Sequence, residues 1–305
     1  MNPHNLPPIL ISNIRSGFGA RGDAWLATLP DLLEQTAQRW NLTLSPAFDA
    51  LSYNYVCPVR CADGSEAVLK LGVPDPELTS EIAALQLYAG RGTARLLQAD
   101  AEKGALLLER LRPGRMLADI EDDDRATEIG AEAMKALWRP VPPENHFLTI
   151  EGWAAGLKKI PERFPQGSPL PQELVDLAEN LFAELLPSQT ARKVLHGDFH
   201  HYNILSSDGG WLVIDPKGLL AEPEYEVTSF LRNPFDLVER PNALRVTERR
   251  IAILCERLGF DRKRVRQWAI AHAVLSAWWD VEFDGDSSRA SGSLRCAEIF
   301  QKVKA

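Results

Sequence analysis

Several features that would place this chain in a special class are scarce or missing. Its 305 residues include four cysteines, too few for a disulfide framework, and no second Cys or His pair completes a zinc site with Cys57 and Cys61. The N-terminus lacks a basic segment followed by a long apolar core, and no apolar run approaches membrane-spanning length. We therefore expect reduced thiols, a cytoplasmic location and no membrane partner.

An excess of basic residues is also missing. The chain has 34 Lys and Arg against 42 Asp and Glu, a net charge of −8, which disfavours nucleic acid as a partner but is compatible with a cationic small molecule. Hydrophobic residues make up 45% and charged residues 25%, as in an ordinary globular protein. The length suits one large domain or two lobes, and we expect a monomer or a homodimer.

The stretch Leu195–Pro216, LHGDFHHYNILSSDGGWLVIDP, carries the most specific polar pattern in the chain. Two short apolar runs around an Asp-Gly turn predict a β-hairpin. Asn203 and Asp215 lie symmetrically about Gly209, so the hairpin should bring an amide oxygen and a carboxylate together beside Asp198. Hard oxygen ligands beside a base suit Mg²⁺-dependent phosphoryl transfer. The alternative is a buried polar hairpin with incidental acids.

These residues also carry a resemblance to a known family. His-x-Asp followed by Asn and then a metal aspartate resembles the protein-kinase catalytic loop. The form His-Gly-Asp-x-His, with Asp-Pro in place of Asp-Phe-Gly, is similar to the aminoglycoside phosphotransferases, and HGDFHHYNIL and GWLVIDPKGL resemble the streptomycin 6-kinase and hydroxyurea phosphotransferase branch. The resemblance implies an α+β, bilobal, protein-kinase-like fold. Residues 1–110 would form a small antiparallel-sheet, nucleotide-binding lobe with an N-terminal extension, and 111–305 a mainly helical catalytic and substrate-binding lobe.

The resemblance implies ATP and Mg²⁺ as cofactors and assigns roles to five residues. Asp198 would orient and deprotonate the acceptor hydroxyl, and Asn203 and Asp215 would hold Mg²⁺. Lys70 ends an apolar, strand-like run and would contact the phosphates. Glu81, eleven residues later in a helical stretch, would pair with Lys70.

The phosphate-covering loop departs from the protein-kinase pattern. That loop is glycine-rich in protein kinases, whereas Ala50–Val56 contains no glycine. The resemblance places Ser52 and Asn54 at the loop tip, and Ser and Asn tolerate tight turns. These contacts are therefore the least specified part of the predicted nucleotide site.

A linker is predicted after the strand-like run that ends at Glu109. Pro113-Gly114 breaks the secondary structure, as a linker should. By resemblance this is the hinge where main-chain groups meet adenine, with Glu109 offering its carbonyl and Leu111 its amide. The alternative is simply a strand end and a turn.

Apolar periodicity gives the remaining elements. Residues 1–28, rich in Pro, Gly and Asn, indicate an extension or a loosely packed arm. Helices are expected at 31–40, 76–90, 125–138, 151–160, 172–186, 247–258 and 262–279. Hairpins are expected around Ala62–Gly64 and Glu102–Gly104.

Two groups of acids follow the hairpin and are candidates for a cationic acceptor: Glu222, Glu224 and Glu226, and then Asp280, Glu282 and Asp284. Carboxylates bind guanidinium groups with paired hydrogen bonds. Trp278 and Trp279 favour the second group, because aromatic faces also hold such cations. We expect Asp280, Glu282 and Glu222 to contact the acceptor; the alternative is a solvated acidic surface.

The predicted function is ATP-dependent phosphorylation of a hydroxyl on a small molecule. No Ala-Pro-Glu motif follows Asp215, so the peptide-docking element of a protein kinase is missing. An aminoglycoside such as streptomycin, phosphorylated as in antibiotic resistance, is the first candidate acceptor. The alternatives are hydroxyurea, another small metabolite, or a nucleotide-binding pseudokinase without catalysis.

Overall fold

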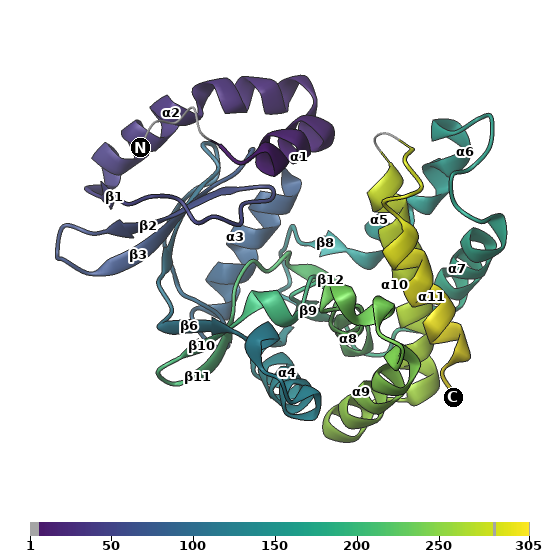
Figure 1. Cartoon of the computed structure of the whole chain (residues 1–305). Coiled ribbons are helices and arrows are strands. Elements are labelled where there is room, and N and C mark those ends of the chain that lie inside the picture. Colours follow the sequence, from purple (N-terminus) through teal and green to yellow (C-terminus); the bar gives the residue numbers. More distant parts are fainter. Residues whose placement is uncertain (1–5, 283–284, 305) are drawn as a thin grey trace. The chain divides into compact units, whose positions relative to one another are not determined.

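The computed structural model describes residues 6–282 and 285–304. The chain divides into two compact units, Met1–Arg112 and Pro113–Ala305, called here the first and second units. The first unit is an antiparallel sheet with three helices, and the second is mainly helical with two small sheets (Figure 1). The predicted α+β class is confirmed.

The first unit is built on a five-stranded antiparallel sheet with the order β1-β2-β3-β5-β4. Both predicted hairpins are present, because β2 pairs with β3 and β4 with β5. The strands are β1 (Thr43–Leu44), β2 (Tyr55–Arg60), β3 (Glu66–Leu71), β4 (Leu96–Asp100) and β5 (Ala105–Glu109).

From Pro8 onward the N-terminal segment is helical and packed on the sheet, so of the two alternatives, an extension or a loosely packed arm, the second is wrong. Helix α1 (Pro8–Phe18) and α2 (Ala20–Trp40) lie along one face of the sheet, as the purple ribbons of Figure 1 show. Their apolar side chains join one core cluster with the strands, and the buried helical members are Leu10, Ile14, Trp25, Leu29 and Leu33. These residues recur at helical spacing, which the Pro- and Gly-rich composition obscured.

Helix α3 (Pro76–Tyr88) covers the opposite face of the same sheet, where its Leu78, Ile82 and Leu85 cluster with Leu106 and Leu108. Asp75 caps its first turn by accepting a hydrogen bond from the Leu78 N–H at 2.7 Å. Side chains alternate between faces along a strand. In β3, Leu69 and Leu71 therefore face α1 and α2, whereas Lys70 faces α3.

Helices dominate the second unit, and most lie close to their predicted ranges. They are α4 (Asp123–Leu137), α5 (Ile150–Ala154), α6 (Ile160–Arg163), α7 (Gln172–Leu185), α8 (Pro223–Leu231), α9 (Ala243–Leu258), α10 (Arg262–Val281) and α11 (Ser291–Lys302). The single helix expected at 151–160 is instead broken into α5, a short 3-10 turn and α6. Pro161 stands at the start of α6, a position that favours a new helix over continuation.

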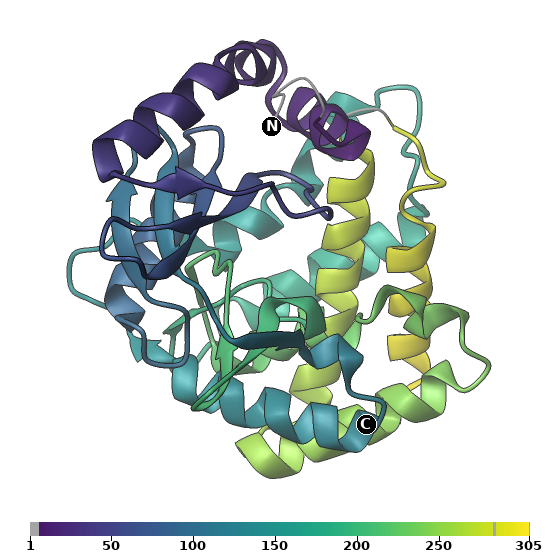
Figure 2. The same ribbon diagram turned by 60° about the vertical axis from the view of Figure 1, so that its left-hand side comes forward.

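Helices α8 and α10 form the centre of the second unit. Every residue from Tyr225 to Leu231 is buried, and α10 is buried almost all round from Val265 to Trp278. Helix α10 packs against α7, α8, α9 and α11, and Figure 2 shows α11 running beside it. A helix that is apolar on all sides belongs in a core, so polar groups on α8 and α10 need partners.

Two small sheets carry the loops of the second unit. One has the order β11-β10-β6, with β6 (Pro113–Met116), β10 (Ile204–Ser207) and β11 (Gly210–Val213). The other has the order β7-β9-β12-β8, with β7 (Arg139–Pro140), β8 (Leu148–Thr149), β9 (Lys193–Leu195) and β12 (Leu219–Ala221). The stretch Leu195–Pro216 starts at the end of β9, forms the β10–β11 hairpin and leads into β12.

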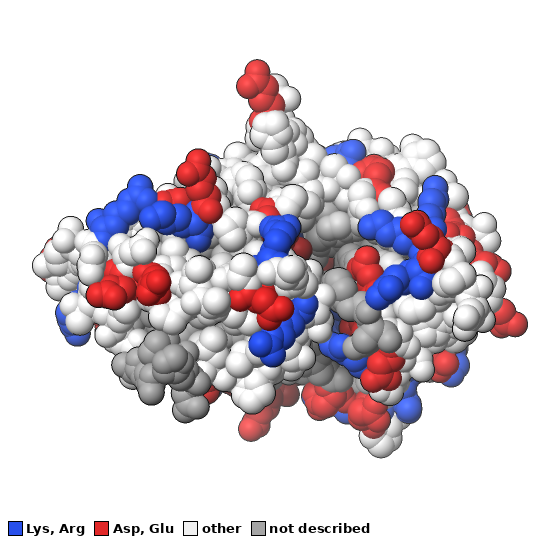
Figure 3. Space-filling view, turned by 90° about the horizontal axis from the view of Figure 1, so that it is seen from above, with Lys and Arg blue, Asp and Glu red and all other residues white. Residues whose placement is uncertain are grey.

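Acidic and basic side chains are interspersed on the face that Figure 3 shows, where several red and blue groups lie against one another. Within the described part of the chain, no helix combines the length and the apolar character that crossing a membrane requires. The four cysteines are unpaired.

Candidate active site

The β10–β11 hairpin positions the predicted metal ligands, and its prediction is confirmed. Ile204 pairs with Val213 and Ser207 with Gly210, so the turn is made by Asp208 and Gly209. The Ile214 N–H donates to the Asn203 carbonyl at 2.9 Å, which places Asn203 opposite Ile214, one residue before Asp215. The hairpin therefore returns Asp215 to the end of the sheet where Asn203 lies.

The loop that carries Asp198 is fixed by a buried histidine. His196 is fully buried, its Nε2 lies 2.8 Å from the Ile214 carbonyl, and its Nδ1 accepts the Asp198 N–H at 3.2 Å. Burial lowers the pKa of His196 to about 4, so the ring is neutral near pH 7. With Nδ1 as the acceptor, the proton lies on Nε2, and one ring connects the Asp198 backbone to Ile214, the residue between β11 and Asp215.

The Asp198 carboxylate is partly accessible and ionised. Its side chain is 37% exposed, and Oδ2 lies 3.6 Å from His200 Nε2. Burial opposes ionisation, but the nearby His200 and Lys217 hold the pKa of Asp198 below its ordinary value. An ionised carboxylate that solvent can reach is able to accept a hydroxyl proton.

Asn203 and Asp215 fit a magnesium ion by their donor chemistry. The Asn203 amide Nδ2 donates to the Asp198 carbonyl at 3.0 Å, so its Oδ1 stays available as a ligand. Asp215 is half-buried and has the left-handed backbone, φ 59°, that aspartate adopts more readily than most residues. Mg²⁺ prefers oxygen ligands and takes only one or two protein groups beside nucleotide phosphates.

A buried glutamate that we did not predict for this role anchors the loop that carries Asp198. Glu226 of α8 is 1% exposed, and its two oxygens accept the N–H groups of His196 at 2.7 Å and Gly197 at 2.9 Å. Burial raises its pKa from 4.5 to about 7, although these two backbone hydrogen bonds oppose the rise. No signal in the sequence indicated this role, because Glu226 stands two residues after Glu224 and resembles a member of an acidic run.

We expect Glu226→Gln to lower kcat about 10- to 100-fold with little change in the KM for ATP, since small misplacements of a catalytic group carry costs of this size. A glutamine offers one oxygen and one NH₂ group, so one loop N–H loses its acceptor. Steady-state kinetics between pH 5.5 and 8.5 provide the measurement. The wild-type rate should rise through about pH 7 as Glu226 ionises, and this rise should be missing in the variant.

Over the pH range in which the rate rises, the stability of the fold should fall. Because the pKa is raised in the folded state, ionisation of Glu226 destabilises the fold as pH rises from 4.5 to about 7. The variant should lose this part of the pH dependence of Tm. For the kinetics, Glu224→Gln is the matched control, because Glu224 lies on the same helix while the loop N–H groups of His196 and Gly197 bond to Glu226. Similar kinetic losses in both variants would contradict the anchoring role.

In the first unit, the predicted Lys70–Glu81 pair is formed. Lys70 Nζ lies 2.7 Å and 2.8 Å from the two Glu81 oxygens, and both residues are buried. The pair connects the central strand β3 to α3. Buried charges of opposite sign hold each other in place, because separating them would leave an unpaired charge in the core.

The predicted phosphate loop lies between Leu51 and Tyr55 and is supported by α1. Asn13 of α1 donates to the Ser52 carbonyl at 3.2 Å. Asn54 lies over Gly72 at the end of β3, where a Cβ would come within 2.3 Å of the Asn54 Oδ1. The glycine that this region requires is therefore Gly72 rather than a residue of the loop.

The predicted hinge follows β5. Glu109 is the last residue of this strand. The Glu109 Oε2 accepts hydrogen bonds from Arg95 N at 3.1 Å and from Arg95 Nε at 3.2 Å. The main-chain carbonyl of Glu109 takes no part in that ion pair. Leu111 is 8% exposed and stands one residue before the end of the first unit.

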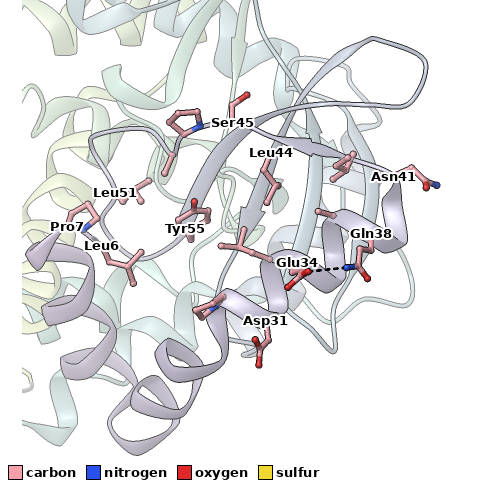
Figure 4. Close-up of a pocket in the computed structure, with 16 residues that line it drawn as sticks. Leu6, Pro7, Asp31, Glu34, Gln38, Asn41, Leu44, Ser45, Leu51 and Tyr55 are labelled. Atoms are coloured by element: carbon pink, nitrogen blue, oxygen red, sulfur yellow. Dashed lines mark hydrogen bonds between the residues drawn. The ribbon is translucent and has the colours of Figure 1, made fainter. Parts of the chain in front are cut away.

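The first unit also contains a cavity of about 820 Å³ between α2, β1 and the segment 45–51 (Figure 4). Leu51 and Tyr55 line it and flank the predicted phosphate loop. Its rim includes Asp31 and Glu34 of α2, which Figure 4 shows at the edge of the cavity. None of the predicted site residues is among its lining side chains.

Glu222, one of the acids predicted to contact the acceptor, has partners inside the second unit. Glu222 is 1% exposed, and its carboxylate is held by Arg264, with Nη2 2.8 Å from Oε2, and by the Trp268 N–H. Glu222 is thus engaged in the core of the second unit, and we do not retain it as an acceptor contact. The sequence did not indicate these two partners, because both lie more than 40 residues away from Glu222.

Asp280 and Glu282 occupy different positions at the end of α10. Asp280 is half-buried and accepts the Ser293 hydroxyl at 2.8 Å, and burial raises its pKa. Glu282 follows the last helical residue, Val281, and its backbone carbonyl accepts Arg163 Nε at 2.9 Å. Residues two apart at the end of a helix do not share a face, so Asp280 and Glu282 do not present their carboxylates side by side. Asp284 lies outside the described residues.

Comparisons with known proteins identify the family of this chain. The family described as aminoglycoside/hydroxyurea antibiotic resistance kinase matches residues 39–284. Streptomycin 6-kinase of Streptomyces glaucescens is 33% identical and covers 97% of each chain. Hydroxyurea phosphotransferase of Kitasatospora aureofaciens is 34% identical over 92% of this chain and 82% of its own length.

Among solved structures, a thermostable mutant of aminoglycoside phosphotransferase APH(4)-Ia, in complex with ADP and hygromycin B, matches with a TM-score of 0.59. Sequence identity is 14%, over 88% of this chain and 97% of that one, which establishes a shared kinase-like fold. The chain therefore belongs to the aminoglycoside/hydroxyurea antibiotic resistance kinases, a family of ATP-dependent small-molecule phosphotransferases.

Proposed function

We propose that this protein transfers the γ-phosphoryl group of ATP to a hydroxyl of an aminoglycoside such as streptomycin. The observation that carries the proposal is the partly exposed, ionised Asp198 on a rigidly held loop, with Asn203 and Asp215 at the adjoining end of the hairpin. Relatives named streptomycin 6-kinase match nearly the whole chain and support the choice of acceptor.

Each residue has a distinct task in this proposal. Asp198 orients the acceptor hydroxyl and receives its proton as the phosphoryl group arrives. Asn203 Oδ1 and the Asp215 carboxylate hold Mg²⁺, which when bound neutralises charge on the phosphates. Lys70, kept in place by Glu81, contacts the phosphates, and the segment with Ser52 and Asn54 covers them. The Glu109 carbonyl and the Leu111 amide receive adenine.

Hydroxyurea is the second candidate acceptor, because a hydroxyurea phosphotransferase is 34% identical. A non-catalytic nucleotide-binding role is disfavoured by the presence of Lys70, Asp198, Asn203 and Asp215 together. The test is ATP consumption with a panel of aminoglycosides, hydroxyurea and hydroxylated metabolites, followed by mass spectrometry of the product. A mass gain of one phosphate on streptomycin supports the proposal. Phosphorylation of hydroxyurea alone would replace the acceptor, and no ATP consumption with any acceptor would contradict a kinase role.

Asp215→Ala should abolish the Mg²⁺-dependent part of nucleotide binding, because Asp215 supplies the only carboxylate among the two proposed metal ligands. Calorimetric titration of ATP with and without Mg²⁺ is the measurement. Asp208→Ala, an exposed acid at the turn of the same hairpin, is the matched control. Tm is recorded alongside, since alanine adopts the left-handed backbone of position 215 less readily. Unchanged metal dependence in Asp215→Ala would show that the ligand assignment is wrong.

A further inference from the structure

An aromatic side chain lies directly beside the catalytic loop. Gly197, which precedes Asp198, has φ 84°, and a Cβ there would lie 3.2 Å from the Trp153 ring at Cη2 and 3.2 Å from the Lys217 Cβ. Trp153 belongs to α5, a helix of five residues whose first turn is capped by Thr149. The ring of Trp153 therefore borders the backbone that positions the base.

Trp153 meets a second tryptophan from α10. The rings of Trp153 and Trp279 are 5.2 Å apart between centroids and cross at 85°, so together they make a right-angled corner. Behind them, Tyr225 and His272 are 1% exposed, and the Tyr225 hydroxyl lies 2.6 Å from His272 Nδ1. That buried pair supports the corner from the core side, with Trp279 5.9 Å from His272 and Trp153 6.4 Å from Tyr225.

The two tryptophans of the corner are more exposed than the tryptophans of the core. Trp268 and Trp278 are 0% and 1% exposed, as expected for side chains of the core. Trp153 and Trp279 are half-buried, and within the described residues neither indole N–H has a hydrogen-bond partner. Both side chains are thus partly accessible, and the Trp153 ring lies beside Gly197, the residue that precedes Asp198.

We propose that Trp153 and Trp279 form the acceptor-binding corner and select acceptors that carry a planar cation, such as a guanidinium group, near the phosphorylated hydroxyl. The electron-rich face of an indole attracts a cation, and two faces at right angles can contact it from two sides. The negative charge of Asp198 adds to this attraction. The inference rests on the proposed phosphotransferase function, names the residues that choose the substrate, and replaces the acid clusters expected from the sequence.

The test compares streptomycin binding to wild type, Trp279→Leu, Trp279→Phe and Trp40→Leu by calorimetry, with ADP and Mg²⁺ present so that no turnover occurs. Trp279→Leu should weaken binding about five- to thirtyfold, the range expected for a desolvated cation–aromatic contact. Trp279→Phe keeps an aromatic face and should retain most of the affinity. Trp40→Leu replaces a half-buried tryptophan of α2 in the first unit and should leave affinity unchanged.

A competition experiment distinguishes the effect of the ligand's charge from the effect of its shape. Methylguanidinium should displace streptomycin from wild type, whereas methylurea, a neutral molecule of the same shape, should not. Equal competition by both, or equal affinity of Trp279→Leu and wild type, would overturn the assignment. Lack of streptomycin binding to wild type would also overturn it, while phosphorylation of a neutral acceptor would leave the kinase function standing. Trp153→Leu is a second variant; a loss of kcat alone, with unchanged streptomycin affinity, would show that this ring only supports the loop.

Discussion

Replacing Asp198 by asparagine is expected to slow phosphoryl transfer roughly 10²- to 10⁴-fold, the usual cost of losing a general base. The affinity for Mg·ATP should stay within a few-fold of wild type, because the residues proposed to bind the nucleotide are unchanged. Asparagine keeps the size of the side chain, and the hydrogen bond from the backbone N–H at this position to His196 does not depend on the side chain. What is lost is the carboxylate that receives the proton.

The measurement is the turnover of the best acceptor from the panel, with calorimetric titration of nucleotide on the same protein. Asp208→Asn, an acid exposed at the hairpin turn, should keep wild-type turnover. Since the pKa of Asp198 is held below its ordinary value, protonation of this base should not limit the rate near neutral pH. Turnover of Asp198→Asn within tenfold of wild type would remove Asp198 from the role of base.

The elements around the site could be predicted because their signals are local. The β10–β11 hairpin follows from two apolar runs and an Asp-Gly turn, and the Lys70–Glu81 pair follows from a strand end and a helix eleven residues later. The hairpin register differs from the expected symmetry by one residue, so Asn203 lies opposite Ile214 instead of Asp215. Local patterns therefore predicted which residues come close to one another, but not the final register of the hairpin.

The contacts that could not be predicted join segments far apart in the chain. Glu226 reaches His196 across 30 residues, and Glu222 reaches Arg264 across 42. In sequence, both acids look like members of an exposed acidic run, and only the packing of α8 in the core shows that each has a buried partner. The contact between Trp153 and Trp279 could not be predicted for the same reason, because the two residues lie in different helices and meet only in the folded second unit.

The N-terminal helices show a different limit. Composition favoured an irregular arm, because proline and glycine usually interrupt structure. In the fold, Pro8 starts α1, where its missing N–H costs nothing, and Gly19 separates α1 from α2 with a positive φ of 54°. The apolar periodicity was the better predictor here, because burial against the sheet determines whether these segments are helical.

Loss of Arg250 should have the largest effect on stability in the second unit. Its side chain is 1% exposed, and its Nε donates to both oxygens of Asp123 at 3.0 and 3.1 Å. It also donates to the Asn233 carbonyl and lies over the Phe230 ring at 5.6 Å. One guanidinium thereby joins α9 to the start of α4 and to the end of α8, the helix that carries the loop anchor Glu226.

Arg250→Met is expected to reduce the free energy of unfolding by about 3–5 kcal/mol, because it leaves Asp123 and a buried carbonyl without their partner. The neighbouring Arg249 offers a matched control, since it pairs with Asp124 while its side chain is 45% exposed. Arg249→Met should cost no more than about 1 kcal/mol, as is usual for an exposed ion pair. Urea denaturation followed by tryptophan fluorescence measures both variants. Equal losses would show that the buried pair does not stabilise the second unit, whereas partial recovery in Arg250→Met combined with Asp123→Leu would show that the unpaired carboxylate causes the loss.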